Sequence, residues 1–123
     1  YVPPIAAQYI AFLKVENKLD GYLDAMYRSA EEFDDFYDFT IPSPVTEDPT
    51  QTNDGMHYTR AVNDEIAAAV ADGDPRFGLD VKKLDFADYR RKMIEATNAF
   101  IAAGHINGYQ HAAIEKVPAT KSQ

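Results

Sequence analysis

Only one short segment of this chain has the pattern of a convincing β-strand. Residues 36–40, Phe-Tyr-Asp-Phe-Thr, alternate in character and are rich in aromatic side chains, and Pro42 follows them. A single strand leaves the backbone groups along both of its edges without partners. Either a part of the polypeptide outside these 123 residues supplies the other strands of the sheet, or the segment is not a strand. Tyr1-Val2, before the turn at Pro3-Pro4, is a second short strand candidate.

Four segments have the periodicity of amphipathic helices. Residues 5–32 predict two packed helices that separate near Asn17–Gly21, and Thr59 is the expected N-cap of a helix that runs to about residue 71. A last helix is expected over 86–103, capped by Asp85 and stopped by Gly104. The predicted core-facing positions are Ile5, Tyr9, Phe12 and Leu13, then Leu19, Leu23, Met26 and Tyr27, then Val62, Ile66 and Val70, and finally Tyr89, Met93, Ala96 and Phe100.

Composition limits the class of protein and of partner. The chain has 123 residues, of which 46% are hydrophobic, enough for the core of one small globular domain. Its net charge of -8 would repel phosphate, so nucleic acid is not an expected partner. It has no cysteine, which excludes disulfide and thiolate chemistry, and no apolar run approaches the ~20 residues of a membrane span. Residues 104–123 are expected to form a loose C-terminal tail.

The long loop over residues 41–58 carries the residues with the clearest chemical potential. Its three prolines, Pro42, Pro44 and Pro49, argue against helix, and loops of this length in compact domains are usually functional or mobile. It contains Asp54-Gly55-Met56-His57. Serine-type catalysis needs an imidazole with one nitrogen toward the hydroxyl and the other held by a carboxylate. Gly55 permits a tight turn that would bring Asp54 to Nδ1 of His57. The alternative is a surface histidine near the start of a helix, with no catalytic role.

The segment 52–70, TNDGMHYTRAVNDEIAAAV, resembles the last catalytic block of the SGNH (GDSL-type) hydrolase superfamily, in which Asp-x-x-His precedes a closing helix. The order of features over residues 1–103 is similar to that of a bacterial group of SGNH-like envelope proteins. The matching features are Tyr1-Val2-Pro3-Pro4-Ile5, Asp38-Phe39, Thr46-Glu47, Asp54 and His57-Tyr58, Val62, Asp64 and Ile66, and Phe77-Gly78-Leu79.

The resemblance implies an α/β, three-layer (flavodoxin-like) fold of which residues 1–103 form the helix-rich C-terminal part. It implies a catalytic role for His57 as base and for Asp54 as the residue that orients it. The implied substrate is an O-acyl ester, expected to be O-acetyl, on a cell-envelope polysaccharide. The implied location is the periplasm or cell envelope, with a membrane-anchored parent protein. No cofactor or metal is implied.

The chain also departs from that group at informative positions. Ala6 stands where the group often has a histidine, and residues 50–53 replace its usual aromatic residues. The Gly-Asp-Ser block that carries the nucleophile is absent, as are the oxyanion-hole blocks, and the chain's three serines are Ser29, Ser43 and Ser122. A missing N-terminal half or a companion chain is therefore the expected source of the serine. The alternatives are a catalytically degenerate SGNH-like scaffold subunit of a larger assembly and a self-contained helical interaction module.

Other polar clusters have simpler interpretations. Asp72-Gly73-Asp74 with Asp80 matches no known calcium loop and is better explained as an acidic helix terminus. The spacing of His105 and His111 is not that of a zinc site, so both are expected to be surface residues. The acidic run over residues 31–35 is expected to be solvated.

Overall fold

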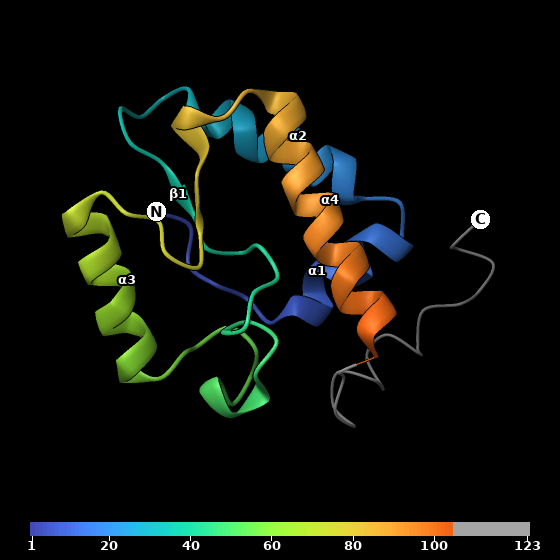
Figure 1. Cartoon of the computed structure of the whole chain (residues 1–123). Coiled ribbons are helices and arrows are strands. Elements are labelled where there is room, and N and C mark those ends of the chain that lie inside the picture. The colour runs from blue at the N-terminus through green and yellow to red at the C-terminus, as the bar shows by residue number, and fades with distance from the viewer. Residues whose placement is uncertain (105–123) are drawn as a thin grey trace.

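The computed structural model describes residues 1–104, and Figure 1 shows how their elements are arranged. This part of the chain contains four α-helices, two two-residue strands and two short 3-10 turns. In chain order they are α1 (Ala7–Val15), α2 (Leu19–Ala30), β1 (Tyr37–Asp38), η1 (Pro49–Gln51), α3 (Arg60–Asp72), β2 (Leu79–Asp80), η2 (Val81–Lys83) and α4 (Phe86–Ala103). None of the helices described is long and apolar enough to cross a membrane.

The strand expected over residues 36–40 is present, although only Tyr37–Asp38 form a ladder. β1 pairs antiparallel with β2, with Tyr37 opposite Asp80 and Asp38 opposite Leu79. On its other side Val2 forms an isolated parallel bridge with Asp38, so the strand expected at Tyr1-Val2 is present only as one bridged residue. The prediction that β1 needs a partner from elsewhere is wrong, because Leu79–Asp80, too short to show alternation, supplies one edge and Val2 the other.

Side chains of the β1 segment alternate between two apolar clusters, and helices therefore lie on both sides of the strands (Figure 1). Phe36 belongs to a cluster with residues of α1, α2 and α4, whereas Tyr37 and Phe39 pack against Val62, Ile66 and Ala69 of α3. The architecture is thus a mixed, helix-rich α/β arrangement around a small sheet.

The core face predicted for the first helix is wrong for Tyr9 and Phe12, although Ile5 and Leu13 pack against the main apolar cluster as expected. Ala7, Gln8, Ile10 and Ala11 are buried in α1, whereas Tyr9 and Phe12 are exposed. The reason is tertiary: Ala7 and Ala11 form an apolar cluster with Phe100 of α4, and their small side chains allow the two helices to approach closely. The predicted break between the two helices is confirmed at Asn17, which has a φ of 57° in the turn over residues 16–18, but Gly21 lies inside α2.

The later helices agree more closely with the sequence pattern. Thr59 caps α3 by accepting a hydrogen bond from the N–H of Val62, and Asp85 caps α4 by accepting from the N–H of Asp88. Gly73 and Gly104 end the two helices in the left-handed conformation. Two core positions are shifted by one residue: Ala69 is buried where Val70 was expected, and Thr97 where Ala96 was expected.

The structure also tests the predictions made for Pro49 and for the acidic run. Pro49 does not prevent helix altogether, because it occupies the first turn of η1, where no donor is needed from its nitrogen. The acidic run over residues 31–35 is exposed, as expected. The predicted tail, apart from Gly104, lies outside the described residues.

A fully buried carboxylate, that of Asp38, joins the strands to the helices. Its Oδ1 accepts hydrogen bonds from the backbone N–H of Thr40 at 2.8 Å and from the Thr40 hydroxyl at 2.6 Å. Its Oδ2 accepts from the hydroxyl of Tyr89 in α4 at 2.6 Å. The hydroxyl of Tyr22 in α2 donates to Thr40 Oγ1 at 3.2 Å. Burial first, and the Asp38 carboxylate second, raise the pKa of Tyr22 to about 12 and also raise the pKa of Tyr89, so both phenols remain donors.

The first prediction concerns this carboxylate. Tyr89→Phe removes the one donor to Oδ2 of a buried charged group, and we expect the free energy of unfolding to fall by about 2–3 kcal/mol. Tyr22→Phe is the matched control, because its hydroxyl bonds a neutral oxygen, and we expect a loss of about 1 kcal/mol. Urea unfolding followed by circular dichroism measures both. Equal losses in the two variants would contradict the role assigned to Tyr89.

The second prediction concerns Gly78, which lies against Phe39. A Cβ there would fall 2.6 and 2.8 Å from two atoms of the buried Phe39 ring and 2.9 Å from the Asp38 carbonyl oxygen. We expect Gly78→Ala to lower the free energy of unfolding by about 1–3 kcal/mol through overpacking. Gly21→Ala is the control: nothing lies within 4 Å of its Cβ position, and alanine should stabilise α2 by up to about 1 kcal/mol. A neutral Gly78→Ala would show that Phe39 can move freely.

Candidate functional site

The loop between η1 and α3 is closed by its own backbone and by one threonine. Thr52 and Tyr58 form an antiparallel bridge, and the N–H of Thr59 donates to the carbonyl of Gln51 at 3.0 Å. The Thr52 hydroxyl donates to the carbonyl of His57 at 2.7 Å. Residues 52–58 therefore form a compact turn immediately before α3.

Within this turn the carboxylate of Asp54 binds both the backbone and the side chain of His57. Its Oδ1 accepts from the backbone N–H groups of Met56 at 2.9 Å and His57 at 2.8 Å. Its Oδ2 lies 2.5 Å from Nδ1 of the His57 imidazole. Gly55 between them has a φ of 80°, a conformation that glycine adopts readily. The hydrogen bond expected between the two side chains is present.

Local hydrogen bonds, and not burial, determine the electrostatics of the pair. The side-chain bond to His57 and the two backbone N–H groups hold the pKa of Asp54 well below its usual range. Both side chains face water, with 51% of Asp54 and 87% of His57 exposed. Asp54 is therefore ionised at neutral pH and can hold the imidazole with its Nδ1–H toward the carboxylate.

That orientation leaves the other ring nitrogen available. In a neutral imidazole whose Nδ1 donates, Nε2 is the acceptor. The imidazole lines a shallow surface pocket of about 190 Å³, whose other walls are the polar and aromatic residues Thr50, Gln51, Thr52, Asn53, Tyr58 and Thr59. The pair is thus arranged so that Nε2 could take a proton from a hydroxyl group placed beside it.

The N-terminus of α1 is attached to the same turn, which sequence reasoning missed. The N–H of Ala6 donates to the carbonyl of Gly55 at 2.7 Å, and the N–H of Ala7 donates to the carbonyl of Thr46 at 2.9 Å. The hydroxyl of Tyr9 donates to the Asp54 carbonyl at 3.3 Å. The first N–H groups of a helix lack partners within the helix, and here loop carbonyls provide them. Tyr9, expected in the core, therefore lies beside the Asp54–His57 pair.

The serines within residues 1–104 are engaged elsewhere. Ser29 donates its hydroxyl to the carbonyl of Ala25 inside α2. Ser43 is buried in a turn with Thr46, where its Oγ accepts from the Thr46 N–H at 3.2 Å. Thr46, one of the residues that carry the resemblance, is itself buried and bonded within this turn. Ser122 lies outside the described residues.

Other candidate sites have ordinary partners. Asp72 accepts from the Arg76 guanidinium at 3.1 Å, and Asp74 accepts from the backbone N–H of Arg76 at 3.1 Å. Asp80 is 3.7 Å from the ammonium of Lys83. Within residues 1–104 there is no group of three or more acidic or histidine side chains that could hold a metal ion. His105 and His111 lie outside the described residues.

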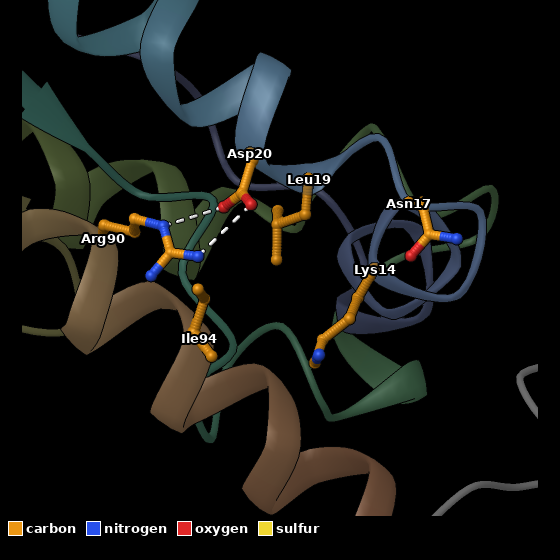
Figure 2. A pocket seen from close by; sticks show the side chains of 6 residues that line it. All are labelled: Lys14, Asn17, Leu19, Asp20, Arg90 and Ile94. Carbon is orange, nitrogen blue, oxygen red and sulfur yellow. Dashed lines mark hydrogen bonds and ion pairs between the residues drawn. The ribbon is translucent and has the colours of Figure 1, made fainter. Parts of the chain in front are cut away.

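A second pocket, of about 150 Å³, lies between the α1–α2 turn and α4 (Figure 2). Its walls are formed by Lys14, Asn17, Leu19, Asp20, Arg90 and Ile94. The Arg90 guanidinium donates to both oxygens of Asp20, at 2.8 and 3.2 Å, and this bond raises the pKa of Arg90. Asp20 neutralises the guanidinium, which leaves the Lys14 ammonium as the remaining charge among the lining residues, so the Asp54–His57 turn is the better candidate.

No protein-family model matches the chain, and neither a curated protein nor a solved structure matches it.

Proposed function

We propose that His57 is the general base of an SGNH-like serine esterase or acyltransferase, and that the Asp54 carboxylate orients its imidazole. The observation that carries the proposal is the 2.5 Å contact between Asp54 Oδ2 and His57 Nδ1, on an imidazole that is otherwise open to solvent. The proposed chemistry needs a serine nucleophile, and we propose that an N-terminal half or a companion chain supplies it. We also propose that the mixed α/β arrangement described above is part of a three-layer SGNH-like domain.

The mechanism follows from the orientation of the imidazole. Nε2 of His57 accepts the proton of the serine hydroxyl as the oxygen attacks the ester carbonyl. Asp54 stabilises the imidazolium that forms, and Nε2 then returns the proton to the leaving alkoxide. Water, or an acceptor hydroxyl in a transferase, attacks the acyl-enzyme with the help of the same base and releases the acyl group.

The resemblance supplies the rest of the proposal. It assigns as substrate an O-acyl ester, expected to be O-acetyl, on an envelope polysaccharide. It also assigns a location in the periplasm or cell envelope, with a membrane-anchored parent protein.

A second candidate function is that of a catalytically degenerate scaffold subunit. Ala6 favours it, since the resembling group often has a histidine there and this alanine lies directly against the turn through its bond to Gly55. The high exposure of His57 is also compatible with a pair that has lost its substrate cleft.

The third prediction separates these two functions. In the complete protein, a fluorophosphonate probe should label one serine, and His57→Ala should reduce the labelling rate at least about 100-fold because the base is lost. Intact-mass spectrometry followed by peptide mapping measures the rate and identifies the serine. His105→Ala and His111→Ala are matched controls and should label at the wild-type rate. If every serine remains unlabelled, the scaffold function is supported. If a serine is labelled at the same rate in His57→Ala, His57 is not its general base and the proposed role of the pair is wrong.

The fourth prediction concerns the tautomer. Asp54→Asn keeps an oxygen for the backbone N–H groups but can place an amide donor against Nδ1, which moves the ring proton to Nε2. We expect kcat for hydrolysis of an acetyl ester to fall by about 10³–10⁴-fold, with KM nearly unchanged. Steady-state kinetics with p-nitrophenyl acetate gives both constants. An unchanged kcat would remove Asp54 from the mechanism.

A further inference from the structure

Thr52 occupies a central position in the turn that holds Asp54 and His57. Its hydroxyl donates to the carbonyl of His57 at 2.7 Å and accepts from the N–H of Gly55 at 2.9 Å. Its backbone forms the bridge with Tyr58. One side chain thus connects the residue after the aspartate with the histidine itself.

Both functions of the hydroxyl are used by these two bonds. A threonine hydroxyl has one proton, which lies toward the His57 carbonyl at 2.7 Å, while a lone pair receives the Gly55 N–H. The Asp54 Oδ1 atom is 3.5 Å from the same hydroxyl, too far for a strong bond. Thr52 therefore acts mainly on the backbone of the turn, whereas the shorter bonds to the Asp54 carboxylate come from the two N–H groups and the imidazole.

Hydrogen bonds fix the shape of the turn on its solvent side. Asp54, Met56 and His57 are all exposed, so hydrogen bonds and not apolar packing determine where the carboxylate and imidazole lie. Gly55 is the buried exception, tied to α1 through the Ala6 N–H. Thr52 joins this anchored glycine to the exposed histidine.

We propose that Thr52 is a positioning residue that holds the imidazole of His57 with Nδ1–H against Asp54. The inference rests on the proposed function for its catalytic meaning, but its structural content can be measured in this chain without any substrate. Thr52→Val keeps the branched shape and removes both hydrogen bonds, whereas Thr52→Ser keeps the hydroxyl.

The chain offers a matched control two residues away. The Thr50 hydroxyl donates to Asp48 Oδ1 at 2.7 Å in the same loop, and the Thr50 backbone N–H keeps that carboxylate partnered when the hydroxyl is lost. Thr50→Val therefore removes a comparable exposed hydroxyl bond that does not touch Gly55 or His57.

The fifth prediction is tested by NMR of the 123-residue chain, with the His57 signals assigned by their absence in His57→Ala. In the wild type, ring ¹⁵N shifts should show the Nδ1–H tautomer, and the Asp54 carboxyl ¹³C should titrate well below its usual range. In Thr52→Val we expect the ring to move toward the tautomer mixture of a free imidazole and the Asp54 pKa to rise toward the ordinary value of about 3.9. Thr52→Ser and Thr50→Val should both keep the wild-type signals.

In the complete enzyme, Thr52→Val should lower kcat by about 10–100-fold at nearly constant KM, and Thr52→Ser should restore it. Wild-type ring and carboxyl signals in Thr52→Val, or equal changes in Thr50→Val, would overturn the positioning role. Failure of the proposed function would look different: the NMR signals would respond to Thr52→Val while no serine in the complete protein was labelled.

Discussion

The fold depends on the hydrogen bonds that stabilise one buried carboxylate, that of Asp38. Asp38 lies in a strand whose regular pairing extends over only two residues, so backbone ladders contribute little to joining the sheet to the helices. A buried carboxylate is costly unless hydrogen bonds replace its water. Thr40 and Tyr89 supply those bonds, and Tyr89 can do so only if α4 lies against β1. The relative position of helix and strand is therefore tied to the solvation of a single side chain.

A similar pattern of hydrogen bonds recurs at the candidate site, where the carboxylate of Asp54 is exposed whereas that of Asp38 is buried. In Asp38 and Asp54 alike, Oδ1 accepts two donors from nearby residues, and Oδ2 faces a ring-bearing side chain, Tyr89 or His57. Burial makes the first carboxylate a fixed part of the core. Exposure leaves the second pair open to a reacting group, because the imidazole retains one nitrogen that the carboxylate does not use. The chemical difference between the two aspartates comes from their surroundings.

The sequence predicted the features that depend on local chemistry. The caps Thr59 and Asp85 follow from hydroxyl and carboxylate groups before an apolar period, and the contact within Asp-x-x-His follows from spacing and Gly55. β2 was missed because two residues carry no alternation.

Features that depend on tertiary packing could not be predicted in this way. The core face of α1 follows from its contact with Phe100, some ninety residues later in the chain. The attachment of α1 to the turn follows from the same packing, and no local pattern around Ala6 or Tyr9 reveals it.

This attachment bears on how the pair could work. Gly55 is held by the N-terminus of α1, and α1 packs against α4, so the turn is fixed to the helical core on one side while the imidazole faces water on the other. A base in that position is oriented but not enclosed. Most of the rate enhancement of a serine hydrolase comes from preorganised donors around the developing oxyanion in a water-excluding site. An esterase built on this pair therefore requires that the part bearing the serine also cover the exposed face of His57, whereas a scaffold has no such requirement.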